Sequence, residues 1–278
     1  MENSKVYFHY CSVQTMISIF QSKEIWLSNS RKMNDYHETT WIEQFIDNKL
    51  NEIDPKKYGE FIRLFVQNYK LNASVPYIAC FSEDGDVLSQ WRAYSEDGSG
   101  VAIGFDIEKL GIENKLPITG ATSQISTGFS KVIYDIEAQK NIVNQIFDHW
   151  LDKINLGTTD TTASIEVMGQ LKMYASIFKN PSFKEEKECR LIHTPLILDN
   201  NENETTLMGQ MSDVYFRENK RDIVSYFKWS FEKEFSSSII PKIIVGPKCR
   251  LEKYDFNMYL SVNGLQKTEV SPSSSSYR

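Results

Sequence analysis

Short apolar segments of strand length alternate along this chain with longer segments of helical periodicity, and this alternation limits its fold more than any other feature. β-branched and aromatic residues dominate the short segments, a composition typical of strands. We therefore expect an α+β fold in which helices are inserted between the strands of a mixed central sheet. The predicted strands are 7–10, 25–30, 76–82, 101–105, 131–134, 183–194, 214–217, 223–227, 239–247 and 267–270.

The helical segments contain no candidate chemistry of their own. Apolar residues recur at helical spacing over about 39–71 and 136–180, and we expect both regions to be insertions that cover the core of a single domain, 1–278. Ser12 predicts the N-cap of a further helix. Residues 198–206 are polar and acidic, which predicts an exposed loop.

One predicted strand, 183–194, combines alternation with a row of charges. Side chains alternate across a strand, so Glu186, Glu188 and Arg190 would share one face at a repeat of about 7 Å. If that face borders a cleft, one carboxylate could have a raised pKa while the other stays ionised. The alternative interpretation is a solvated strand with cross-strand ion pairs.

Composition excludes several classes of function. The net charge is −6, so the whole molecule does not attract nucleic acid by its bulk field. The four cysteines are scattered without a Cys-x-x-Cys pair, which makes structural zinc an unfavoured interpretation. No apolar run is long enough to span a bilayer, and the N-terminus lacks the apolar core of a signal peptide. We expect a cytoplasmic protein that does not enter a membrane.

The order of several short motifs resembles a bacterial family known as domain of unknown function 2971. The similar segments run from the first predicted strand to the C-terminus, and their order is more specific than any one of them. They are 9–12, 25–28, 34–38, 80–82, 90–94, 100–105, Glu186-x-Glu188-x-Arg190, 244–247 and the terminal Ser-Tyr-Arg.

The C-terminal segment, 271–278, supports two different expectations. Its serine-rich composition predicts disorder. The family resemblance instead implies an ordered tail that places Arg278 in the site. This chain lacks the proline that the family ending has before its last two residues, so the tail is less constrained in conformation.

The chain is also similar, in the order and spacing of its polar residues, to ADP-ribosyltransferases. This similarity implies a mainly antiparallel, ADP-ribosyltransferase-like sheet with NAD as substrate. It implies that Glu188 contacts the nicotinamide ribose, where a carboxylate stabilises the oxocarbenium-like transition state. Glu186 would orient or deprotonate the acceptor. His9, grouped with these carboxylates, and Tyr10 would bind the adenosine side of NAD or its ribose.

Further residues complete the site that this similarity implies. Ser28 and Asn29 would brace the catalytic carboxylate or contact the nicotinamide amide, and Trp91 or Tyr94 could stack on a flat ring. Guanidinium groups match a diphosphate bidentately. The candidates are Arg190, Arg217, Arg221 and Arg278.

Simpler interpretations stand beside these assignments. Trp91 fits a core position equally well, and His9 in an apolar strand is typical of a satisfied core histidine. Asp35 fits a helix N-cap. Arg217 and Arg221 could pair with neighbouring acidic residues on the surface.

Three functions are compatible with this pattern. The favoured one is an NAD-consuming ADP-ribosyltransferase or glycohydrolase that acts as a bacterial anti-phage defence effector or toxin, with a protein, nucleic acid or water as acceptor and a partner protein encoded nearby. The second is a nuclease in which Asp35, Glu38 and the Glu186/Glu188 pair hold Mg²⁺. The third is a non-catalytic module that senses a nucleotide ligand.

Overall fold

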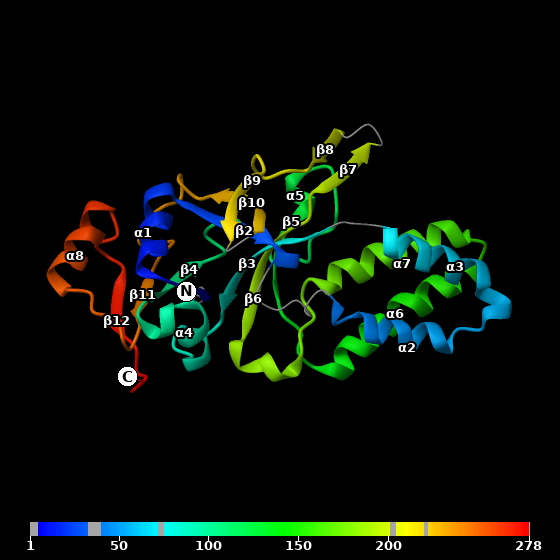
Figure 1. The fold of residues 1–278 in the computed structure, drawn as a ribbon, viewed down its shortest axis with the longest axis horizontal. Helices are drawn as coiled ribbons and strands as arrows, with labels where there is room; N and C mark the ends of the chain where they lie inside the picture. Colours follow the sequence, from blue (N-terminus) through cyan, green and yellow to red (C-terminus); the bar gives the residue numbers. More distant parts are fainter. Residues whose placement is uncertain (1–4, 33–39, 72–74, 201–203, 220–221, 278) are drawn as a thin grey trace.

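A computed structural model describes residues 5–32, 40–71, 75–200, 204–219 and 222–277. Within these ranges ten strands form one sheet, with a helical unit at one end and a helix-covered edge at the other (Figure 1). The strand order is β12-β11-β4-β1-β3-β2-β10-β9, and β6 joins β3 and β5 outside this path. The strands are β1 (Val6–Cys11), β2 (Glu24–Asn29), β3 (Tyr77–Ser82), β4 (Val101–Asp106), β5 (Thr127–Lys131), β6 (Glu188–His193), β9 (Tyr215–Asn219), β10 (Asp222–Ser230), β11 (Lys242–Val245) and β12 (Glu269–Pro272).

Strand β3 is the branch point of this sheet. Along one edge it pairs with β6 over its whole length, from Tyr77 opposite His193 to Ser82 opposite Glu188. Two other strands pair with opposite ends of β3: β1 through Ser82, and β2 through Tyr77 and its neighbour. A strand has only two edges, so β1 and β2 share the second edge and the sheet splits between them. Every pair in the sheet is antiparallel except β11–β12, which confirms a mixed, mainly antiparallel sheet.

Four helices form the unit at one end of the sheet, and they fall within the two regions of predicted helical insertion. They are α2 (Glu43–Glu52), α3 (Pro55–Leu71), α6 (Ile136–Asn155) and α7 (Asp160–Ala175). Their apolar faces meet around Phe61, Phe147 and Leu171, which are fully buried. The same cluster includes Ile78 of β3 and Ile192 of β6, so the helices pack directly on the central strands.

The remaining helices cover the other parts of the sheet. Helix α1 (Val13–Ser22) begins at Ser12, whose hydroxyl accepts the Thr15 N–H as an N-cap should. Helices α4 (Leu88–Tyr94) and α5 (Ser123–Ser126) are short, and α8 (Lys253–Val262) connects β11 to β12. The helical and strand segments expected from periodicity are therefore found, with shifts of a few residues at their ends.

Two expectations about local structure, one for a loop and one for a strand, are wrong. The polar segment predicted as an exposed loop forms a hairpin of β7 (Leu196–Asn200) and β8 (Glu204–Met208). This hairpin is a separate two-stranded sheet, and its apolar and polar residues stand in separate runs, so no core-facing alternation can be detected. The strand predicted at 131–134 lies earlier, at Thr127–Lys131. The prediction missed this position because Gly128 and Ser130 interrupt the apolar pattern of the segment.

The serine-rich tail is ordered through Tyr277, so the prediction of disorder from composition is wrong. Ser273 and Ser274 both donate hydrogen bonds to the Asp86 carboxylate. The Tyr277 hydroxyl donates to Asp97 at 2.7 Å, and its ring lies against Lys248. Side-chain hydrogen bonds, rather than apolar burial, hold this segment, and a compositional argument does not detect them.

We expect Asp86→Ala to lower the free energy of unfolding by about 2 kcal/mol. Asp86 accepts one hydrogen bond of 2.7 Å from the Nε1 of fully buried Trp91, and removing the carboxylate leaves that donor without this partner. The tail would also lose its anchor. Urea denaturation measures the change, with Asp213→Ala on the exposed surface as the control. Equal stability of the two variants would contradict this assignment.

Candidate functional site

A small pocket of about 70 Å³ lies where β1, β3 and α4 meet the segment that leads into β6. Its walls come from parts of the chain that are far apart in sequence. Aromatic rings form most of the wall, and two carboxylates border one side. The lining residues are Phe8, His9, Tyr10, Cys80, Phe81, Gln90, Tyr94, Glu186 and Glu188.

Glu186 and Glu188 reach this pocket from two different elements, so the prediction that they share one strand face is wrong. Glu186 ends the 3-10 helix η4 (Pro181–Glu186), and Glu188 begins β6. Between them Lys187 adopts a left-handed conformation (φ 47°), which interrupts the strand. The two carboxylates nevertheless converge, because Lys179 Nζ lies 2.7 Å from Glu186 Oε2 and 2.9 Å from Glu188 Oε2.

Arg190 completes a buried charge network with these groups. Its Nε donates to Glu188 Oε1 at 2.7 Å and its Nη2 donates to Glu188 Oε2 at 3.0 Å, a bidentate pair. Its Nη1 donates to the carbonyl oxygen of Ser176 at 2.8 Å. Arg190 is 1% exposed and is fully engaged in this way, so the structure contradicts its assignment to a diphosphate.

The same network sets the ionisation of Glu188. Burial alone would raise the pKa of this carboxyl, but the positive charges of Arg190 and then Lys179 outweigh burial and lower the pKa to about 2. The backbone N–H of Glu188 donates to the Tyr134 hydroxyl at 3.0 Å, which further fixes the position of the residue. Glu188 is therefore an ionised carboxylate at neutral pH, and it is not the carboxyl of raised pKa that a proton donor requires.

His9 faces the pocket as a neutral base. Its Nδ1 lies 2.9 Å from the carbonyl oxygen of Cys80. A carbonyl oxygen can only accept, so Nδ1 carries the proton and Nε2 keeps its lone pair. Burial lowers the pKa of the imidazole, which favours this neutral form.

The two tyrosines of the pocket differ in how far their side chains are available to a ligand. The Tyr10 hydroxyl donates to the carbonyl oxygen of Asp84 at 2.8 Å and accepts the N–H of Val87 at 2.9 Å, so its polar end is already satisfied. Tyr94, at the end of α4, lines the pocket and is 41% exposed. Burial and then the nearby Glu186 charge raise the pKa of its hydroxyl, which stays protonated. Tyr94 is therefore the ring in this pocket that can meet a flat ligand.

Several predicted site residues lie elsewhere. Trp91 is fully buried with its ring edge-on to Tyr10, so it belongs to the core and cannot stack on a ligand. Ser28 pairs with Ile78, four residues from the Ser82 that faces Glu188, which is about 13 Å along β3.

The residues beside Ser28 form a second polar cluster at that far end of β3. Asn29 Nδ2 donates to the Ser225 hydroxyl at 3.4 Å, and Arg217 Nη2 donates to the Ser28 hydroxyl at 3.2 Å. Ser28 and Asn29 therefore do not brace Glu188, and Arg217 does not reach the acidic pocket. Arg217 is exposed and its described contact is with Ser28, so its predicted surface pairing with an acidic neighbour is not found.

Lys179 is the residue that sequence reasoning missed. It lies just after the end of α7, within the region 136–180 that periodicity predicts to be helical, and it is 4% exposed. A buried lysine near two glutamates is a tertiary arrangement, and nothing in the local sequence marks it. The candidate positions Asp35, Glu38, Arg221 and Arg278 lie outside the described residues. Within the described ranges, no three His, Cys, Asp or Glu side chains are grouped to hold a metal ion.

The fold and pocket together define an α+β protein with a mainly antiparallel sheet and inserted helices. Residues 90–191 match the model of a family described as protein of unknown function (DUF2971). This match supports the resemblance to that family, and it spans Tyr94, Lys179 and the Glu186–Arg190 segment. No curated protein and no solved structure matches the chain. In the described part of the chain, no helix has the length and apolar character needed to cross a bilayer.

Proposed function

We propose that this chain is an NAD-binding, ADP-ribosyltransferase-like enzyme that breaks the bond between nicotinamide and ribose. The observation that supports this most is the convergence of Glu186 and Glu188 with His9, Tyr10 and Tyr94 on one pocket. These residues come from the first strand, from α4 and from the late strand β6 and its approach. A carboxylate pair facing aromatic rings suits a ligand with a ribose and a flat base.

The reaction would use the permanent charge of Glu188. When the C1′–N bond breaks, its electron pair leaves with nicotinamide, and the ribose develops positive charge at C1′ and the ring oxygen. An ionised carboxylate held in a buried site stabilises that charge without reorganising. Glu188, whose pKa is about 2, provides such a carboxylate throughout the neutral range.

The second half of the reaction requires a base for the acceptor. The acceptor oxygen, from water or from a protein or nucleic-acid hydroxyl, would attack C1′ and lose a proton. Glu186 is the predicted acceptor of that proton, although Lys179 stabilises its charged form and weakens it as a base. His9 Nε2 is a second base on the same pocket. An enzyme that consumes NAD in this way fits a bacterial anti-phage effector or toxin.

One observation favours a different function, a non-catalytic nucleotide-sensing module. Both oxygens of Glu188 already accept hydrogen bonds from Arg190 or Lys179, and the pocket is small. A ligand bound there could form few hydrogen bonds with Glu188, because both of its carboxylate oxygens already accept hydrogen bonds from the protein. A magnesium nuclease is less compatible, because Lys179 Nζ already lies between the two carboxylates that would hold the metal.

NAD turnover by the purified chain tests the proposal. We expect nicotinamide release by the wild-type chain and at least a 100-fold lower rate for Glu188→Gln, a loss of roughly 2.7 kcal/mol of transition-state stabilisation. Glutamine keeps the shape of the side chain and removes its charge. Chromatography of released nicotinamide gives the rate, and circular dichroism checks the fold of the variant.

A matched control is available three residues away on the same segment. Glu185 is exposed and close in sequence to the pair, so Glu185→Gln should leave the rate unchanged. If ADP-ribose binds but neither the wild-type chain nor any variant turns over NAD, the enzyme proposal fails and the nucleotide-sensing module is favoured. If the folded wild-type chain shows neither binding nor turnover, both proposals fail.

A further inference from the structure

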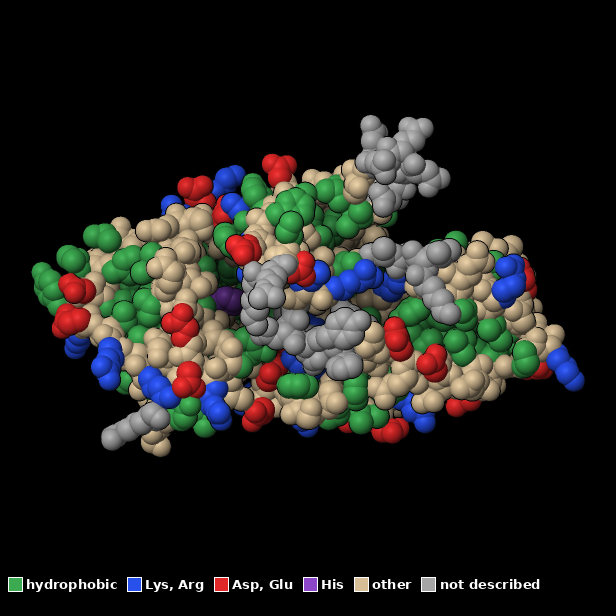
Figure 2. Space-filling view, viewed as in Figure 1, with side chains coloured by type: hydrophobic (Ala, Val, Ile, Leu, Met, Phe, Trp, Pro, Cys, Tyr) green, Lys and Arg blue, Asp and Glu red, His purple; other side chains and the backbone are tan. Residues whose placement is uncertain are grey.

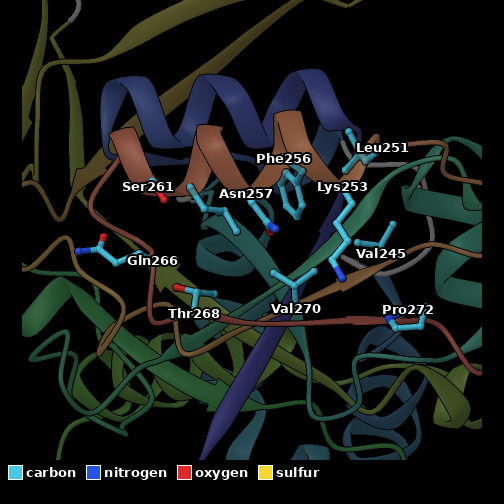
Figure 3. A pocket seen from close by; sticks show the side chains of 11 residues that line it. Val245, Leu251, Lys253, Phe256, Asn257, Ser261, Gln266, Thr268, Val270 and Pro272 are labelled. Atoms are coloured by element: carbon cyan, nitrogen blue, oxygen red, sulfur yellow. The ribbon is translucent and has the colours of Figure 1, made fainter.

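A groove of about 700 Å³ lies at the opposite edge of the sheet from the helical unit, between α8 and β12 (Figures 1 and 3). Strands β11 and β12 are parallel, and α8 is the crossover helix between them. Helix α8 covers only part of the sheet face beneath it, which leaves the space over the edge strand open. The volume lies within the range of 300–1,000 Å³ that is typical of ligand sites.

The groove has an apolar floor and a single charged side chain. Phe256 and Leu260 of α8 and Val270 of β12 are among the apolar residues that line the groove. Lys253 extends from α8 toward the strand (Figure 3). Among the described residues, no carboxylate forms an ion pair with Lys253. An occupant would therefore be largely apolar and would carry one negative charge.

The free edge of β12 indicates what kind of molecule would occupy the groove. The Glu269 N–H donates to Pro241 O at 2.9 Å and the Ser273 N–H donates to Val245 O at 2.8 Å, so both point toward β11. Backbone groups alternate in direction along a strand, so the N–H and C=O of Val270 and the C=O of Pro272 point away from β11. Within the described ranges no strand pairs with this outer edge. Unpaired backbone groups of this kind are a template for another strand.

The outer face of α8 extends the apolar surface beyond the groove. Tyr254, Met258 and Val262 follow one another at four-residue spacing and are 73%, 52% and 77% exposed. This stripe adjoins the groove-facing side of the helix, and apolar side chains gather at that end of the molecule in Figure 2. A helix that is apolar on both its inner and outer faces is typical of one that a partner covers.

We propose that this surface binds an extended peptide segment of a partner protein. The segment would add to the outer edge of β12, place alternate apolar side chains in the groove, and set an acidic side chain against Lys253. A fatty acid could match the apolar floor and the amine, but it would leave the backbone groups of Val270 unpaired. The edge strand therefore favours a ligand that has a backbone of its own.

Selection from phage-displayed random dodecapeptides on the full-length chain tests this proposal. We expect enriched sequences in which apolar residues alternate with polar ones and which contain Asp or Glu. The synthetic form of an enriched peptide is then titrated by fluorescence anisotropy. Its Kd should rise at least tenfold with Lys253→Glu and at least tenfold with Val270→Pro.

Lys253→Glu tests the role of the charge in the groove, and Val270→Pro tests the role of the free edge of β12. Proline at 270 removes an N–H that points away from β11, so the native sheet keeps its hydrogen bonds. Lys140→Glu, a matched charge reversal on the exposed surface of α6 in the helical unit, should change the Kd by less than twofold. No enrichment would overturn the proposal, as would binding that is insensitive to Val270→Pro. If decanoate binds, no peptide does, and Lys253→Glu abolishes the binding of decanoate, the groove is instead a fatty-acid site. If the chain self-associates and Val270→Pro abolishes that association, the edge of β12 pairs with a second copy of the chain.

Discussion

Arg190→Leu should lower the free energy of unfolding by about 3–5 kcal/mol, the largest effect that we expect from a single substitution. The change removes both hydrogen bonds to Glu188 and the one to the carbonyl oxygen of Ser176. Glu188 would remain buried with only part of its charge compensated. Chemical denaturation in urea, followed by circular dichroism, measures the loss.

Two controls make this result specific to the buried network. Arg63 forms a similar pair with Glu60, but on the exposed surface, so Arg63→Leu should have little effect. The double substitution Arg190→Leu with Glu188→Leu removes both charges and should recover much of the lost stability. If Arg190→Leu costs no more than Arg63→Leu, the network does not contribute to the fold as described.

His193 should make the fold sensitive to moderate acid. Its ring is fully buried, Nε2 has no hydrogen-bond partner among the residues that the structure describes, and burial lowers the pKa from 6.5 to about 4. Below pH 6.5 the unfolded chain takes up a proton that the folded chain does not, so stability falls as the pH falls from 6.5 to about 4. The full loss is about 3 kcal/mol, since each pKa unit is worth 1.36 kcal/mol.

Denaturation at a series of pH values, compared with His193→Asn, measures this effect. Asparagine can still accept the hydrogen bond that Thr127 makes with Nδ1, but it does not titrate. The variant should show a flatter pH dependence between 6.5 and 4. Glu188, with a pKa of about 2, contributes stability above pH 4.5 that is lost only at lower pH, so the two windows differ. Equal slopes for the wild-type chain and His193→Asn would contradict the assignment.

The sheet could be predicted from sequence because its strands are strongly apolar. Segments such as β1, β3 and β4 are buried on both faces, and their composition shows it directly. The β7–β8 hairpin has no such pattern, because its two strands are polar toward the turn and it lies apart from the main sheet. The order in which strands pair, with β3 as the branch point, follows from tertiary packing and has no local signal.

The candidate site could be predicted only in part. The spacing of Glu186 and Glu188 predicts that the two carboxylates lie close together, which they do. It also predicts one shared strand face, which is wrong because Lys187 breaks the strand between them. Lys179 closes the network through space and not through sequence spacing. Trp91 shows a different limit: an aromatic residue between polar ones fits a core and a stacking site equally well, and only its burial separates the two.

A crystal structure of the full chain with ADP-ribose tests the central claim most directly. We expect a ribose hydroxyl within hydrogen-bond distance, about 2.5–3.2 Å, of the Glu188 carboxylate, with Tyr94 against the ligand. Lys179 should keep its contacts with both glutamates. ADP-ribose bound elsewhere on the chain, with the acidic pocket unchanged and empty at saturating ligand, would contradict it.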